Sequence, residues 1–139
     1  MKAQDVMTEG PASVRSTVPL REAIAVLQSL DVRHLPVIDR HGELVGLLSD
    51  GDLRKYSFSE VRPELSVDAL ARRLELPVSY VMSRAIFAVR PETELQEIAN
   101  LMIDQQIGAV PVVNSDGTLV GIVSCVDLPR ELVPCAASA

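Results

Sequence analysis

Two short motifs of the same form, Ser49-x-x-Asp52 and Ser124-x-x-Asp127, have the residue types and spacing to do chemistry. Each serine follows an apolar run, where a helix N-cap is expected, and each aspartate then falls in the first helical turn. A purely structural interpretation is sufficient, because an acidic residue that complements the helix dipole stabilises by about 0.3–1 kcal/mol. The free N–H groups at such a helix start also favour an anion, so a binding site is the second interpretation.

No other pattern in the chain indicates catalysis. The sequence contains no Gly-rich phosphate loop of Walker spacing, no Gly-x-Ser-x-Gly and no paired His and Glu metal motif. Cys125 and Cys135 are too few for a disulfide framework or a zinc site, and neither has a histidine close by in sequence. His34 and His41 show no spacing that would complete a metal site. We therefore expect a protein that is not an enzyme and that requires no cofactor.

Composition narrows the class of partner. The 139 residues carry a formal net charge of −6, only 3% are aromatic and none is tryptophan. A nucleic-acid ligand is disfavoured, because phosphate needs positive charge and bases need aromatic faces. There is no signal peptide and no apolar run of about 18 residues, so no membrane partner is expected and the predicted location is cytoplasmic.

The chain is an internal duplication with an offset of 75 residues. Val6-Met7 aligns with Val81-Met82, Pro36-Val37 with Pro111-Val112, and Leu44-Val45-Gly46 with Leu119-Val120-Gly121. Each copy of about 50 residues is too small for a stable core of its own, so the two copies should share one core and form one module. We expect a first repeat over 1–60, a linker with a short helix over 61–79 and a second repeat over 80–139.

Both repeats show the same order of periodicities, β-α-β-β-α. An extended piece at 12–15 or 86–90 precedes a helix whose apolar stripe starts at Leu20 or Leu95. Thr93 and Gln96 have capping-box spacing. A strand at 35–38, a turn ending in Gly42, a second strand at 44–48 and a short helix opened by Ser49 follow, each with its counterpart 75 residues later.

The linker predicts one helix over 67–76, with Ser66 as its cap. The stretch from Asp68 to Tyr80 also has a faint resemblance to the start of a DNA-binding helix-turn-helix. The duplication argues against that alternative, because it assigns Val81-Met82-Ser83 to the start of the second repeat.

These motifs, in this order and twice over, resemble a tandem pair of CBS (cystathionine β-synthase) domains, a Bateman module. The resemblance rests on Val-Met-Thr at 6–8 and Val-Met-Ser at 81–83, the apolar-Pro-Val strand, the Gly-x-Leu-Val-Gly hairpin and Ser-x-x-Asp. It implies an α/β (α+β) fold in which two β-α-β-β-α repeats pack through their sheets with pseudo-two-fold symmetry. Two clefts for adenosine nucleotides, and a homodimer formed through the helices, are expected with it.

The resemblance also assigns binding residues. Asp52 and Asp127 would accept hydrogen bonds from ribose hydroxyls, with Ser49 and Ser124 assisting, and Arg33 and His34 would face phosphates. Each repeat begins with a short segment, around 6–8 in the first and 81–83 in the second, which we call its leading segment. The base would lie among the matching positions near the leading segments and the Pro-Val strands, namely Thr8, Ser83, Ala85, Leu35, Val37, Val110 and Val112. Most of these apolar side chains would be core residues in any case. Gly108 and Ala109 replace the basic pair in the second repeat, so the two clefts should differ.

The function expected from the sequence is that of a regulatory module. It would bind AMP, ADP, ATP or a related adenosyl compound such as S-adenosylmethionine and signal its occupancy to a separate effector protein. The alternative is a structural adaptor for oligomerisation that binds no ligand. An enzyme is the third and weakest alternative.

Overall fold

The computed structural model describes residues 1–57 and 67–132, and these residues divide into two compact units. The β5/β6 unit comprises Met1–Pro11, His41–Leu44 and Phe87–Ala139, and the β3/β4 unit comprises Ala12–Arg40 and Val45–Ile86. Each unit has its own three-stranded sheet and its own apolar core, so the protein is a mixed α+β protein. The expectation of one shared core is therefore wrong, because the buried residues form two separate clusters.

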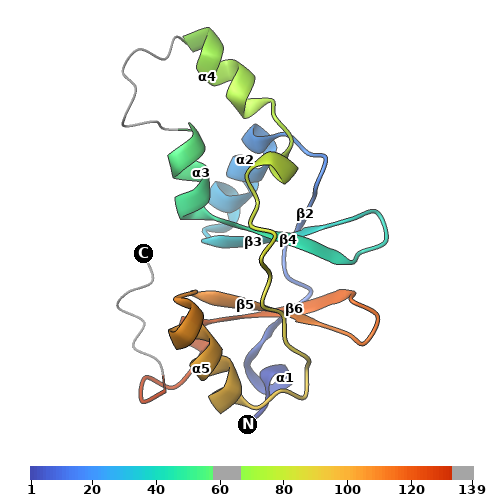
Figure 1. Ribbon diagram of the computed structural model, residues 1–139, viewed down its shortest axis with the longest axis vertical. Helices are drawn as coiled ribbons and strands as arrows, with labels where there is room; N and C mark the ends of the chain where they lie inside the picture. The colour runs from blue at the N-terminus through green and yellow to red at the C-terminus, as the bar shows by residue number, and fades with distance from the viewer. Residues whose placement is uncertain (58–66, 133–139) are drawn as a thin grey trace. The chain divides into compact units, whose positions relative to one another are not determined.

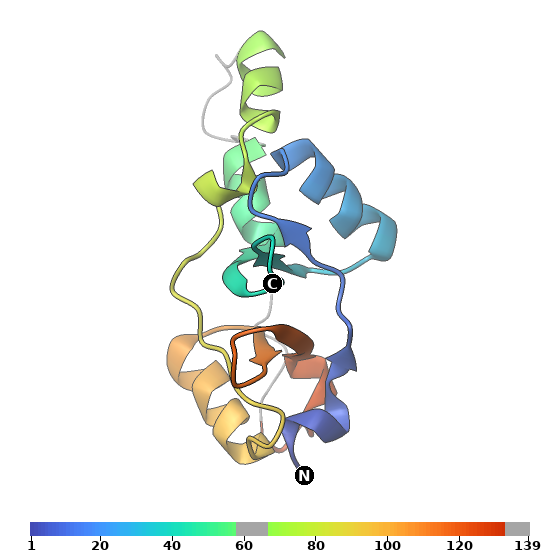
Figure 2. The same ribbon diagram turned by 90° about the vertical axis from the view of Figure 1, so that its right-hand side faces the viewer.

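The sheet of the β5/β6 unit has the order β1-β6-β5, and its neighbouring strands are antiparallel. Its strands are β1 (Thr8–Glu9), β5 (Ala109–Val113) and β6 (Leu119–Ser124). The helices α1 (Ala3–Val6) and α5 (Leu95–Gln105) lie on the same side of this sheet (Figures 1 and 2). The stripe predicted for α5 is confirmed, because Leu95, Ile98 and Met102 are buried in the core.

The sheet of the β3/β4 unit has the order β2-β3-β4, and β2 (Val14–Arg15) runs parallel to β3 (His34–Ile38). Here β4 (Leu44–Ser49) is the second hairpin strand, and α2 (Leu20–Leu30) and α3 (Asp50–Ser57) cover one side of the sheet (Figure 1). The unit also contains α4 (Val67–Leu74) and the one-turn 3₁₀-helix η1 (Val78–Tyr80). The structure therefore ends the linker helix at Leu74, and Ser66 lies outside the described residues.

The two repeats exchange their leading segments. Thr8 of the first repeat pairs with Ile122 in β6, whereas Ser83 of the second repeat pairs with Leu47 in β4. Gly residues allow this close approach. A Cβ atom on Gly121 would lie 2.5 Å from the Met7 sulfur, and one on Gly46 would lie 2.8 Å from Cγ of Met82. Each unit is thus built from both repeats.

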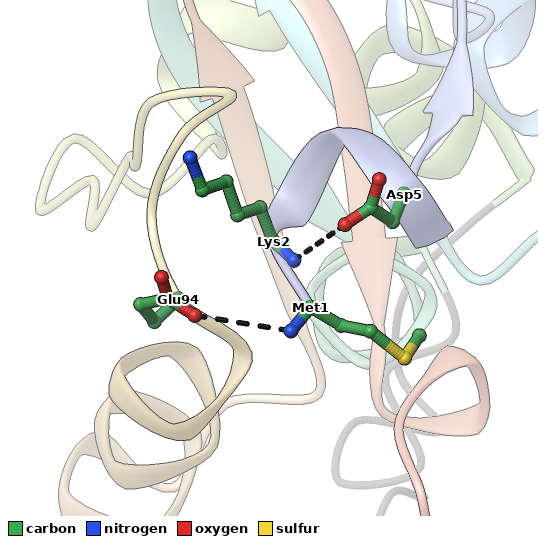
Figure 3. Close-up of polar contacts among 4 residues, drawn as sticks. All are labelled: Met1, Lys2, Asp5 and Glu94. Atoms are coloured by element: carbon green, nitrogen blue, oxygen red, sulfur yellow. Dashed lines mark hydrogen bonds and ion pairs between the residues drawn. The ribbon is translucent and has the colours of Figure 1, made fainter.

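Backbone hydrogen bonds anchor the N-terminal segment to the start of α5. Ala3 N–H donates to the Thr93 carbonyl at 2.8 Å, and Leu95 N–H donates to the Met1 carbonyl at 3.0 Å. Ala3 itself is fully buried. Figure 3 shows the exposed polar contacts beside these bonds, in which the Met1 amino group lies 3.9 Å from Glu94 and Lys2 N–H donates to Asp5. Exposed ion pairs contribute little, so the buried alanine and the backbone bonds hold the segment.

Two local expectations are wrong. Thr93 does not cap α5, because its hydroxyl accepts from Arg90 N–H and Glu94 occupies the N-cap position. The second short helix of the second repeat is only a single 3₁₀ turn, η2 (Cys125–Asp127). Cys125 is buried. Cys135 lies outside the described residues.

The helix-turn-helix alternative also fails. The segment that would form its recognition helix is η1, a single 3₁₀ turn, and Met82 and Ser83 beyond it join the β3/β4 unit. Within residues 1–57 and 67–132, no helix is long and apolar enough to cross a membrane.

Candidate functional site

In the β3/β4 unit, the Ser49-x-x-Asp52 motif closes a reciprocal cap at the junction of β4 and α3. Asp52 N–H donates to Oγ of Ser49 at 3.0 Å, and Ser49 N–H donates to Oδ2 of Asp52 at 3.2 Å. Both side chains are half-buried. The buried end of β4 and the first turn of α3 therefore fix the direction of the Asp52 carboxylate.

Arg33 and His34 lie next to this cap. Asp50 N–H donates to the Arg33 carbonyl at 2.8 Å, which joins the start of β3 to the start of α3. Burial lowers the pKa of His34 below its ordinary value of 6.5, and the positive charge of Arg33 acts in the same direction. The carboxylates of Asp52 and Asp50 oppose that shift. The structure thus brings four of the predicted site residues, Arg33, His34, Ser49 and Asp52, into one neighbourhood.

The β5/β6 unit repeats this frame around Ser124 and Asp127. Ser124 N–H donates to Oδ2 of Asp127 at 2.8 Å, and the Ser124 hydroxyl lies 3.1 Å from the same oxygen. Cys125 N–H donates to the Gly108 carbonyl at 3.0 Å, as Asp50 does to Arg33. The backbone frame is shared, while the charged groups around it are not.

In both caps, a single carboxylate oxygen makes the structural contacts. Oδ2 of Asp52 and Oδ2 of Asp127 accept the cap hydrogen bonds. Among the residues whose side chains the structure describes, 1–53 and 67–132, none donates a hydrogen bond to Oδ1 of either aspartate. Each cap therefore holds one acceptor in a fixed position for an outside donor.

Because the leading segments are exchanged, the residues predicted near them as ligand contacts lie in the unit of the other repeat. Thr8 belongs to the unit of Asp127, whereas Ser83 and Ala85 belong to the unit of Asp52. All three are exposed. No signal in the sequence indicates this crossing, because the offset aligns each leading segment with its own repeat.

The aliphatic residues predicted to contact a base are core residues. Leu35, Val37, Val110 and Val112 are fully buried in the cores of their units. A role for these four side chains in ligand contact stays a prediction. Among the described residues, no group of three or more His, Cys, Asp or Glu is placed to hold a metal ion.

The architecture is a duplicated βαββ unit with exchanged leading segments and one Ser-x-x-Asp cap per copy. It defines a class of small tandem-repeat α+β domains. The sequence model of the CBS domain matches residues 3–59 and 78–133. The chain belongs to the CBS domain family, as a tandem pair. The predicted family and the predicted fold class are both confirmed.

Solved structures of similar proteins carry adenosyl ligands. The CBS domain pair of protein MJ0100, in complex with 5′-methylthioadenosine and S-adenosyl-L-methionine, is 27% identical with a TM-score of 0.77 and 94% coverage of each chain. CBSX2 in complex with AMP is 29% identical with a TM-score of 0.76 and 91% coverage of each chain.

Curated relatives include proteins named for enzymes. The L-aspartate semialdehyde sulfurtransferase of Methanocaldococcus jannaschii is 28% identical over 127 residues, which is 91% of this chain and 22% of that protein. The chain thus spans about a fifth of such relatives. Their names describe proteins that are several times longer.

Proposed function

We propose that this protein is a regulatory module that binds an adenosine nucleotide or a related adenosyl compound, with Asp52 and Asp127 as the ribose ligands. The observation that carries the proposal is the single unused acceptor, Oδ1, that each cap holds in place. A carboxylate is a strong acceptor for a ribose hydroxyl, and hydrogen bonds to charged groups are the stronger kind. Family membership and the ligands of MJ0100 and CBSX2 support it.

A thermal-shift titration tests this proposal. AMP, ADP, ATP and S-adenosylmethionine are titrated into the wild type, Asp52→Ala, Asp127→Ala and the control Asp104→Ala, which removes an exposed carboxylate of α5. A ligand at a hundredfold excess over its Kd adds about 2.7 kcal/mol to stability, so binding is easy to detect. Each variant is compared with its own ligand-free melting temperature, because loss of the cap alone lowers it.

The expected result is a shift for the wild type and Asp104→Ala that is reduced in one or both of the other variants. If no compound shifts the wild type, the ligand-free structural adaptor becomes the better description. Turnover of any compound would instead support an enzyme.

The module is proposed to work by differential binding. A ligand changes an equilibrium between two conformations only by its difference in affinity for them. The output passes to a separate effector protein, and the module itself is a cytoplasmic homodimer formed through its helices. Size-exclusion chromatography with light scattering tests the dimer, and a monomer at tens of micromolar would contradict it.

A further inference from the structure

The two units differ sharply in formal charge. By sequence, the β5/β6 unit contains three Lys or Arg and ten Asp or Glu, a net charge of −7. The β3/β4 unit contains ten Lys or Arg and nine Asp or Glu, a net charge of +1. The acidity of the whole chain therefore belongs to one unit, although the two repeats are copies of one another.

The same difference recurs at the two caps. The carbonyls of Arg33 and Gly108 occupy equivalent places, since each accepts the N–H of the residue that follows the capping serine. In the β3/β4 unit the side chains at these positions are the guanidinium of Arg33 and the imidazole of His34. In the β5/β6 unit they are the hydrogen atom of Gly108 and the methyl group of buried Ala109. The carboxylates of Asp50 and Asp52 act on His34 against the positive charge of Arg33, so the contrast lies in directed donors as well as in net charge.

We infer that the two sites take different chemical classes of ligand. The Asp52 site takes a phosphate-bearing adenosine nucleotide, and the Asp127 site takes an adenosyl compound without phosphate, either neutral or positively charged. This inference rests on the proposed function and assigns a ligand class to each of its two sites. It makes the basic pair at 33–34 the determinant of specificity.

The physical reason is that the ribose contact is common to both sites and the phosphate contact is not. A guanidinium forms directed, charge-assisted bonds to a phosphate, and losing them costs roughly tenfold or more in affinity. A unit of charge −7 also repels an AMP dianion, roughly severalfold in Kd at physiological ionic strength and more strongly at low salt. A neutral or cationic adenosyl compound meets neither penalty.

Calorimetric titration with AMP and with 5′-methylthioadenosine tests the inference, because these two probes differ in phosphate. For the wild type, we expect about one equivalent of AMP at physiological salt. Asp52→Ala and Arg33→Gly should weaken AMP binding by about tenfold or more and change methylthioadenosine binding by less than about twofold. Asp127→Ala should do the reverse.

Arg33→Gly has a matched partner in Gly108→Arg, which places a guanidinium at the other cap. Gly108 is not among the described residues with positive φ, so its backbone conformation is one that arginine also adopts. Gly108→Arg should create a second AMP equivalent. Low salt should widen the difference between the sites and high salt should narrow it, because surface charges are screened.

The outcomes separate the inference from the function on which it rests. Two equal AMP equivalents in the wild type, or an equal loss of AMP binding in Asp52→Ala and Asp127→Ala, would overturn the inference and leave the function standing. Failure of both probes to bind the wild type would overturn both. Far-UV circular dichroism of each variant shows that a loss of binding is not a loss of fold.

Discussion

At the scale of single residues, His34 lies where two carboxylates and a guanidinium all act on its proton. Burial sets the direction, and the pKa of His34 in the folded protein lies below 6.5. The unfolded chain therefore binds more protons than the folded chain around and below pH 6.5. The contribution of neutral His34 to the free energy of unfolding is complete above that pH, and it is lost as the pH falls toward the pKa of the folded protein.

We therefore predict that the free energy of unfolding falls as the pH drops through 6.5 toward the lower pKa of His34 in the folded protein, by at most about 1.4 kcal/mol per pH unit from this one group. His34→Gln should remove that part of the slope in urea denaturation. His41→Gln, which changes the other histidine, should keep it. Identical slopes for the wild type and His34→Gln would show that His34 does not contribute.

A second prediction concerns the glycine beneath Met7. A Cβ atom on Gly121 would lie 2.5 Å from the Met7 sulfur and 3.2 Å from the Thr8 carbonyl oxygen, which is backbone and cannot swing away. Gly121→Ala should destabilise by about 1–3 kcal/mol in chemical denaturation, as overpacking does. Gly51→Ala is the control, because its nearest atom is 3.8 Å away and alanine favours a helix. Equal stabilities of the two variants would contradict the close contact.

At the scale of helices and strands, the sequence predicts an element well when the residues that determine it are close together in the chain. The apolar runs at 35–38 and 44–48 predicted β3 and β4 within a residue, because strand and hairpin signals are local. The predicted length of the second short helix is wrong for the second repeat. Pro129 stands there where the first repeat has Arg54, and a residue before proline is driven to extended backbone. Leu128 accordingly has ψ 149°, and η2 ends after one turn.

The candidate site shows the same limit. Spacing alone predicted the Ser-x-x-Asp caps, because a helix start fixes which groups lie within reach of one another. Spacing could not predict that only one carboxylate oxygen of each aspartate, Oδ2, accepts the cap hydrogen bonds, since that depends on side-chain rotation. Nor could it predict that Thr8 joins the unit of Asp127, because that pairing joins residues from opposite ends of the chain.

A third prediction belongs to the C-terminus of α5. Gln106 adopts the left-handed conformation at φ 54°, which costs a side-chain-bearing residue about 1–2 kcal/mol. A glycine in its place avoids this cost but loses more entropy on folding. Gln106→Gly should therefore raise the free energy of unfolding by about 0.5–1 kcal/mol. Gln105→Gly, one residue earlier and still in the helix, should lower it, and a gain in both variants would refute the argument.

At the scale of the whole molecule, neither repeat contains a complete unit. Without Met1–Pro11 the β5/β6 unit lacks β1 and the fully buried Ala3, and without residues 78–86 the β3/β4 unit lacks buried Val78 and Met82. We predict that fragments 1–60 and 80–139 are each unfolded alone. Far-UV circular dichroism and urea titration of each fragment check this, and a cooperative transition in either one would contradict it.

The exchanged leading segments also affect how the chain is made. All residues of the β3/β4 unit are present once Ile86 has been synthesised, whereas β1 must wait for β6 at Leu119–Ser124. At usual rates of translation that wait is on the order of ten seconds, and a pairing so distant in sequence also closes slowly. Val6 and Met7 are apolar and without their core throughout this time. The segment around β1 is thus made early and folds late, so its apolar residues stay exposed while the rest of the unit is synthesised.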